Sequence, residues 1–177
     1  MSATPAVRRQ PKTKLEVSLS YGCPRLGIPA RTSFVRWAMA TLQHLEQHGS
    51  FDLSIRIVDE DEGLALNRDF RGKSYATNVL SFPSDTLKQR GPRVLGDIAL
   101  CAPVVKREAN EQAKTLSAHY AHLTIHSVLH LLGFDHQEDA AATQMEALEV
   151  QILQGFAYAD PYADPIHVRH ERGVPSV

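Results

Sequence analysis

The chain has 177 residues, 43% of them hydrophobic and 22% charged, a length and composition that suit one globular domain with a core of ordinary size. A formal net charge of −1 excludes a general attraction to polyanions, so any nucleic-acid partner must be met by a local basic patch. The two cysteines, Cys23 and Cys101, exclude a disulfide framework and favour a reducing compartment.

Four strand signals and five helix signals follow one another without strict alternation. Strands are indicated by alternating apolar and polar residues or by short apolar runs, and helices by apolar spacings of three and four. Thr32 or Ser33 is expected to cap the first helix and Gly49 to end it. In chain order the predicted elements are strand 15–21, helix 34–48, strand 51–60, helix 61–72, strands 77–83 and 94–101, and helices 104–113, 117–133 and 138–155.

This order predicts an α+β fold, a single domain in which a mixed sheet of about four strands packs with about five helices. The domain is expected to span residues 14–156, after a flexible N-terminal lead over 1–13 and before a loose C-terminal tail over 157–177. The lead is basic and polar and lacks the apolar core of a secretion signal. No apolar run approaches the roughly 20 residues that cross a bilayer. We therefore expect a soluble, cytoplasmic protein with no membrane partner.

The helix over 117–133 is apolar around most of its circumference, which predicts a buried position, yet it carries four histidines. They fall within an arc of roughly 80° on the helix surface. Buried imidazoles need partners, and histidines eight residues apart lie about 12 Å apart along the axis, so one ion can take only an adjacent pair. The four are His119, His122, His126 and His130. His119 and His122 can be ordinary hydrogen-bonded histidines or can take part in a functional site, and the sequence leaves both alternatives open.

A third imidazole follows the second half of this helix. Gly133 can adopt the left-handed conformation that ends a helix, after which the chain reverses through Asp135 to His136. We therefore predict that His126, His130 and His136 hold one metal ion. Three imidazoles suit zinc, with nickel or another divalent transition metal as alternatives, and leave one position for water, as in catalytic sites. Asp135 is expected to orient a ligand or to cap the turn.

The same spacing matches the metalloprotease pattern H-E-x-x-H-x-x-G-x-x-H in all positions but one. Ser127 stands where the pattern has the glutamate that acts as general base. A serine cannot replace that base at neutral pH, so the metal ligands are retained without the catalytic group. A metallopeptidase-like hydrolase is therefore an alternative that lacks its main catalytic residue.

Two further segments, NRDFRGKSYATNVLSFP over 67–83 and VLGDIALC over 94–101, together with HLTIHSVLHLLGFDH over 122–136, resemble the YbeY family of bacterial endoribonucleases and rRNA maturation factors. The resemblance extends over about residues 15–156, and this combination of motifs is highly specific. The long lead and the tail, which contains YADP twice, depart from the family.

The resemblance implies a single α+β domain with a metal-dependent hydrolase function over residues 14–156. It implies a single-strand-directed endoribonuclease in 16S rRNA 3′-end maturation and ribosome quality control, with ribosomal RNA and the ribosome or its small subunit as partners. It maps the metal ligands onto His126, His130 and His136, and a functionally important arginine onto Arg71. A non-catalytic ribosome-associated factor with a structural metal is a further alternative.

The residues near Arg71 also fit RNA cleavage chemically. Cleavage builds negative charge on the non-bridging phosphate oxygens, which a permanently charged, fork-shaped guanidinium can hold. We therefore predict Arg71 as a catalytic residue, with Arg68 and Lys73 as substrate-binding residues. A second basic cluster that can grip the RNA backbone consists of Lys88, Arg90 and Arg93.

Asn78 and Asp97 also match motif positions of the family, and we expect both to be structural. Asn78 can tie a strand end to the histidine helix. Asp97, which follows Gly96, can be a turn residue or a partner of a metal ligand.

Overall fold

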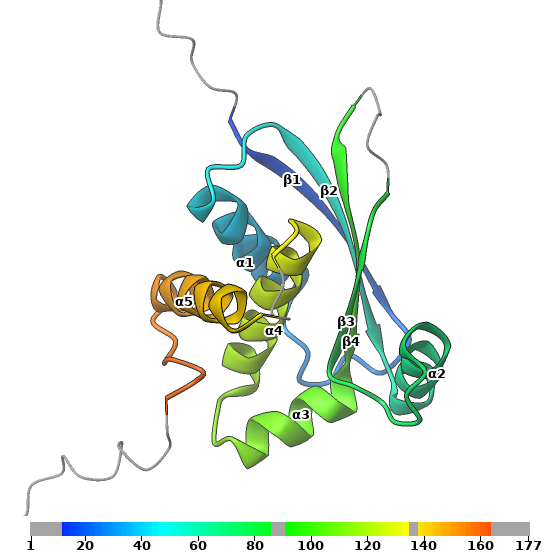
Figure 1. The fold of residues 1–177 in the computed structure, drawn as a ribbon. Helices are drawn as coiled ribbons and strands as arrows, with labels where there is room; N and C mark the ends of the chain where they lie inside the picture. Colours follow the sequence, from blue (N-terminus) through cyan, green and yellow to red (C-terminus); the bar gives the residue numbers. More distant parts are fainter. Residues whose placement is uncertain (1–11, 86–90, 135–137, 164–177) are drawn as a thin grey trace, which may run out of the picture.

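The computed structural model describes residues 12–85, 91–134 and 138–163, which form four strands and five helices (Figure 1). In chain order these are β1 (Lys14–Tyr21), α1 (Arg31–His44), β2 (Ser50–Val58), α2 (Glu60–Arg71), β3 (Val79–Pro83), β4 (Arg93–Cys101), α3 (Ala102–Glu111), α4 (Leu116–Leu131) and α5 (Asp139–Gln154). The predicted α+β architecture is confirmed. None of the helices in these ranges is long and apolar enough to span a membrane.

The four strands form one mixed sheet in the order β1-β2-β4-β3. Strands β1, β2 and β4 are parallel, and β3 is an antiparallel edge strand. Alternation along the strands gives the sheet two different faces. On β2, Leu53, Ile55 and Ile57 are buried, whereas Ser54 and Arg56 between them are exposed.

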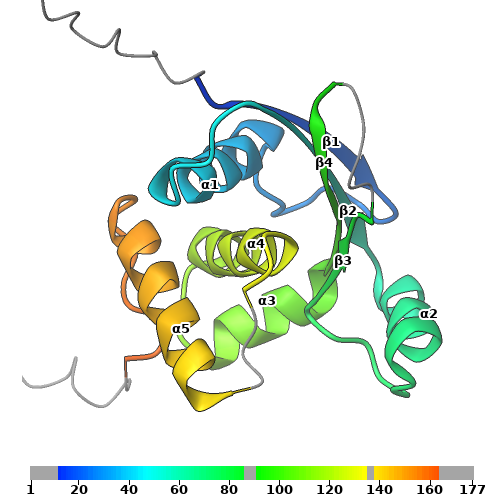
Figure 2. The same cartoon turned by 45° about the horizontal axis from the view of Figure 1, so that its top comes forward.

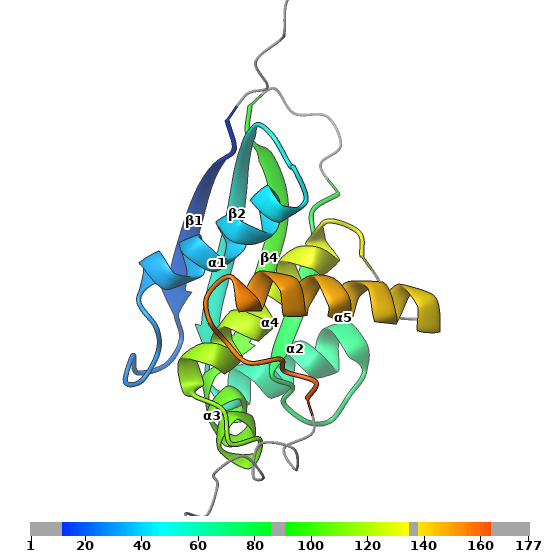
Figure 3. The same cartoon turned by 90° about the vertical axis from the view of Figure 1, so that its left-hand side faces the viewer.

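The helices lie unequally on the two faces of the sheet. Helices α1, α4 and α5 cover one face, and α2 lies on the other (Figures 1 and 2). Seen from the helical side, α5 crosses in front of α4 (Figure 3). Helix α4 is thus enclosed by the sheet and by α1, α3 and α5, and its residues Tyr120, Ala121, Ile125, Val128 and Leu129 are at most 1% exposed. The predicted buried histidine helix is confirmed.

Helix α1 starts and ends earlier than its sequence signals predict. Its N-cap is Ala30, without a side-chain hydrogen bond, so neither Thr32 nor Ser33 caps it. Its end is set at Glu46, which has a φ of 52° and lets the Gln47 N–H donate to the Leu42 carbonyl at 2.8 Å. The chain therefore leaves the helix before Gly49, because a non-glycine residue adopts the left-handed conformation first.

Strand β4 contains an irregularity that explains its glycine. Asp52 pairs with Val94 and Leu53 with Gly96, so Leu95 is an extra residue on β4. Gly96 has a φ of 139°, and a Cβ there would clash with the Phe82 carbonyl of β3. Asp97 consequently lies within β4, paired with Ser54 and Phe82, and the expectation of a turn residue is wrong.

Candidate metal centre

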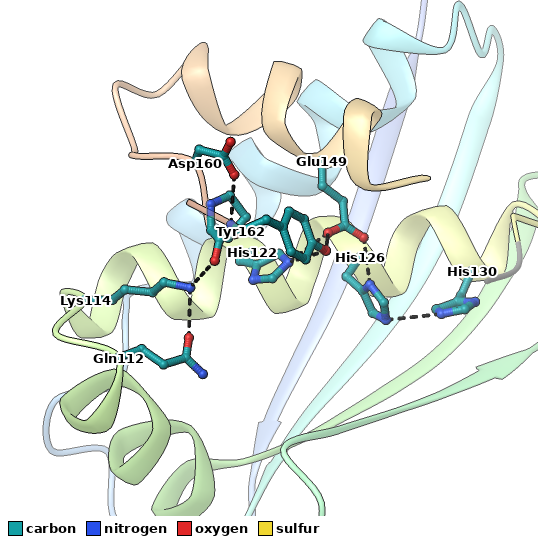
Figure 4. A network of polar contacts seen from close by, with 9 residues as sticks. Gln112, Lys114, His122, His126, His130, Glu149, Asp160 and Tyr162 are labelled. Atoms are coloured by element: carbon teal, nitrogen blue, oxygen red, sulfur yellow. Dashed lines mark hydrogen bonds and ion pairs between the residues drawn. The ribbon is translucent and has the colours of Figure 1, made fainter. Parts of the chain in front are cut away.

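The last turns of α4 bring His126 and His130 together. Their Nε2 atoms lie 3.1 Å apart and their ring centroids 4.6 Å apart (Figure 4). Two nitrogens bound to one tetrahedral zinc at its usual bond length lie about 3.3 Å apart. The predicted pair of neighbouring imidazoles therefore has a separation that fits one shared ion.

A carboxylate from another helix fixes the orientation of the first of these rings. Glu149 of α5 is fully buried, and its Oε1 accepts a 2.7 Å hydrogen bond from His126 Nδ1. A proton on Nδ1 leaves Nε2 of the neutral ring as the lone-pair nitrogen, on the side toward His130 (Figure 4). This is the tautomer that a metal ligand requires.

The second oxygen of Glu149 is held as firmly as the first. Its Oε2 accepts a 2.8 Å hydrogen bond from His122 Nε2 and another from the Tyr162 hydroxyl. Burial alone would raise the pKa of Glu149, but the hydrogen bonds from His122, His126 and Tyr162 outweigh it and lower the pKa to about 2. Glu149 is therefore an ionised carboxylate at neutral pH, although it is inside the protein.

His122 and Tyr162 are neutral donors in this network. Burial lowers the pKa of His122 against the opposing effect of Glu149, and burial together with the Glu149 hydrogen bond raises the pKa of Tyr162. His122, left open by the sequence, is thus a hydrogen-bond partner of Glu149.

The third predicted ligand, His136, and Asp135 lie outside the described residues. Among the residues that the structure does describe, no group of three or more His, Cys, Asp and Glu side chains converges as a metal site. His126 and His130 are therefore two of the three residues in the predicted set, and the three-histidine ligand set stays a prediction.

His119 belongs to a second polar network. Its Nε2 donates to Glu108 Oε2 of α3 at 2.8 Å, and the Asn78 amide donates to the same carboxylate at 2.9 Å. Asn78 precedes β3, so one carboxylate links the start of this strand to α3 and α4. This contact supports the structural role expected of Asn78, which reaches the histidine helix through Glu108.

Ser127 lies in the core and not at the metal centre. It is fully buried, and its hydroxyl has no hydrogen-bond partner among the described residues. The position that holds the general base in metalloproteases therefore offers no group that can take a proton from water.

The predicted RNA-contacting residues lie at the end of α2. Arg68, Arg71 and Lys73 are exposed, and Arg68 Nε forms a 3.1 Å ion pair with Asp69. Helix α2 packs on the sheet face opposite α4 (Figure 2). Of the second basic cluster, Arg93 is exposed at the start of β4, and Lys88 and Arg90 lie outside the described residues.

Two aromatic side chains beside Arg71 were not predicted as functional. Phe70 and Tyr75 are 65% and 59% exposed. The buried Asn67 amide donates to the Tyr75 carbonyl at 2.7 Å, which folds the segment after α2 back onto its last turn. The sequence could have indicated Phe70 and Tyr75, because these aromatic residues are interleaved with Arg68, Arg71 and Lys73.

Glu149 and Glu108 were also missed, although α5 carries a readable signal for Glu149. Glu149 occupies the same face as Met145, Ile152 and Leu153, all of which are buried. A carboxylate at a core position of an amphipathic helix needs partners, so this spacing could have marked it. Its specific partners on α4 depend on helix packing, which the spacing does not reveal.

Comparisons with known proteins agree with the motifs. A family model described as Endoribonuclease YbeY matches residues 28–157. A relative named Endoribonuclease YbeY from Stenotrophomonas maltophilia is 54% identical over 154 residues, which cover 85% of this chain and 94% of the relative. A relative of the same name from Xanthomonas campestris pv. campestris is 52% identical over 155 residues, with the same coverage.

The fold has a counterpart among solved structures. The solution structure of TM1509 from Thermotoga maritima superposes with a TM-score of 0.56 at 23% identity, and covers 85% of this chain and 98% of that one. On the family match and the identity to these relatives, the chain belongs to the endoribonuclease YbeY family.

Proposed function

We propose that this chain is a metal-dependent endoribonuclease that cleaves single-stranded regions of ribosomal RNA. Its membership of the endoribonuclease YbeY family supports the nucleolytic activity. The observation that carries the metal dependence is the 3.1 Å separation of the His126 and His130 Nε2 atoms. Glu149 behind His126 adds the buried acceptor that metal-binding imidazoles usually have.

We propose zinc as the metal, with nickel or another divalent transition metal as the alternative. His126 and His130 would hold it through Nε2, and His136 would complete the set. Bound there, the ion supplies Lewis acidity toward water and toward a phosphoryl oxygen.

The chain's own residues orient the ligands and bind the substrate. Glu149 holds the His126 ring in one tautomer and one orientation. Arg71 is proposed to bind the phosphate whose charge grows during cleavage, and Arg68 and Lys73 the neighbouring phosphates. Phe70 and Tyr75, which are interleaved with these cations in the sequence, are exposed aromatic residues of the kind on which unpaired bases stack.

The proposed physiological role is in ribosomal RNA processing. We propose the small ribosomal subunit and its 16S rRNA 3′ end as the physiological target, with ribosome quality control as the wider role. With such a substrate, we propose the cytoplasm as its location.

The test is incubation of zinc-loaded protein with a 16S rRNA precursor, followed by mapping of the product ends. Wild type should cut single-stranded RNA, and Arg71→Glu should lower the rate by about 10²-fold with an unchanged melting temperature. Lys106→Glu makes the same charge change at an exposed position of α3 and should cleave as wild type does. Intact RNA with the zinc-loaded wild type would overturn the proposal. Digestion of casein in its place would favour a peptidase, which the burial of Ser127 argues against.

A further inference from the structure

The segment after α5 returns to the histidine face of α4. Tyr162 lies in this segment, and its hydroxyl donates to Glu149 Oε2 and lies 3.2 Å from His122 Nε2 (Figure 4). Its ring meets the His122 ring edge to face, with centroids 5.5 Å apart. Tyr162 lies beyond residues 28–157, which the family model matches.

Two contacts hold Tyr162 in place. Lys114 Nζ donates to the Pro161 carbonyl at 2.9 Å and to Gln112 Oε1 at 2.8 Å, which ties the segment to the turn before α4. The Tyr162 N–H donates to Asp160 Oδ1 at 2.8 Å, which closes a local turn at Pro161. The phenol therefore reaches Glu149 from a segment that Lys114 holds at the Pro161 carbonyl and that a local turn makes more rigid.

We propose that Tyr162 is a positioning residue of the metal centre, whose hydroxyl locks Glu149 in the orientation that presents His126 Nε2 to the metal. The inference rests on the proposed metal site. It assigns a role to a residue that lies after the region matched by the family model.

The geometry explains why one hydroxyl matters. Glu149 can hold the His126 ring only while Oε1 faces Nδ1, and rotation of the carboxylate would remove that acceptor. His122 and Tyr162 both fix Oε2, and so oppose this rotation. Tyr162 is also 46% exposed while Glu149 is fully buried, so the phenol lies between the carboxylate and solvent. Loss of its hydroxyl admits water as a competing donor to Glu149.

The test compares two phenylalanine variants from the same segment. Tyr162→Phe keeps the ring contact with His122 and removes only the hydroxyl. Tyr158→Phe is the matched control, because its hydroxyl contacts Ser117 Oγ at 2.9 Å and not Glu149. Zinc affinity, measured by competition with a chromophoric chelator, should fall about tenfold for Tyr162→Phe, the lower end of the loss found for outer-sphere partners of metal ligands. Tyr158→Phe should keep the wild-type affinity.

A second measurement separates positioning from a general structural effect. In a Glu149→Gln background, Tyr162→Phe should cause no further loss of zinc affinity, because the group that it positions has been removed. Wild-type affinity in Tyr162→Phe, or equal losses in both backgrounds, would overturn the inference while leaving zinc-dependent RNA cleavage intact. Failure of the wild-type protein to bind zinc would overturn the proposed function and this inference together.

Discussion

Glu149 is the residue on which the candidate centre depends most. An unpaired carboxylate inside a protein costs several kcal/mol, but donors on both of its oxygens offset this cost. These donors are His122, His126 and Tyr162, and they keep Glu149 ionised with a pKa of about 2. The charge is therefore retained where it can raise the basicity of the His126 imidazole, a proposed metal ligand.

Replacement of this charge should weaken metal binding without leaving a cavity in the core. Glu149→Gln keeps the size of the side chain but offers one acceptor oxygen and one donor nitrogen, so it cannot satisfy both histidines. We expect zinc affinity to fall by about 10–100-fold, measured by chelator competition. Glu146→Gln, on the exposed face of the same helix, should bind zinc as wild type does. Equal affinity in the two variants would show that Glu149 does not orient His126.

Residue-scale prediction succeeded where all partners lie on one helix. His126 and His130 are one turn apart, so their spacing alone predicted that the rings meet, and their Nε2 atoms do. Glu149 lies 23 residues beyond His126, and its contact depends on how α5 crosses α4. No local pattern contains that crossing, which is why the histidine pair was predicted and its carboxylate partner was not.

At the scale of the elements, Glu108 of α3 joins neighbouring segments as Glu149 of α5 does, by accepting hydrogen bonds from a histidine of α4. It accepts hydrogen bonds from His119 on α4 and from Asn78 before β3, and so joins three segments. Burial alone would raise the pKa of Glu108, but the hydrogen bonds from His119 and Asn78 outweigh it and lower that pKa. Its ionised form is thus stabilised by the fold.

A pH-dependent loss of stability follows from this shift. Because the pKa of Glu108 is lower when folded, its contribution to stability is complete above the ordinary pKa of 4.5 and is lost as the pH falls below that value. Glu108→Gln should lower the free energy of unfolding by about 1–3 kcal/mol at pH 7, and by less in acid. Urea denaturation at several pH values measures both. Glu111→Gln, at an exposed position, is the control. If the difference in free energy of unfolding between wild type and Glu108→Gln did not decrease in acid, the assignment would be contradicted.

The types of the elements were predictable, because burial of one face produces a periodic pattern of apolar residues in the sequence. The alternation in β2 and the apolar circumference of α4 both match their burial. Boundaries were less predictable: α1 ends at His44, and Glu46 just after it adopts the left-handed conformation that sequence signals assign to Gly49. Backbone hydrogen bonds from Leu45 and Gln47 end the helix there without a glycine.

Across the whole molecule, the sheet separates the histidine pair from the basic end of α2. The edge strand β3 connects the two sides, because it packs against α4 and its Phe82 ring lies 4.8 Å from Phe70 of α2. An RNA that contacts both must therefore cross this edge. The sequence could not place the two groups, because strand order depends on pairing between distant segments.

Metal binding should stabilise the entire domain, because the ligands converge only in the folded state. Zinc at about 100 times its dissociation constant adds about 2.7 kcal/mol, a rise in melting temperature of about 5–10 °C for a chain of this size. Removal of zinc by chelation should reverse this rise in wild type. The His130→Ala variant should show no response to zinc, and a response of wild-type size in that variant would exclude His130 as a ligand.

The central claim is that the imidazoles of His126 and His130 share one cation. Anomalous diffraction at the zinc edge, from crystals of the zinc-loaded protein, tests it most directly. We predict a single peak about 2.0–2.1 Å from the Nε2 atoms of both rings, with His136 as the third protein ligand. A map without a peak between these rings, or with zinc bound only elsewhere, would contradict the account.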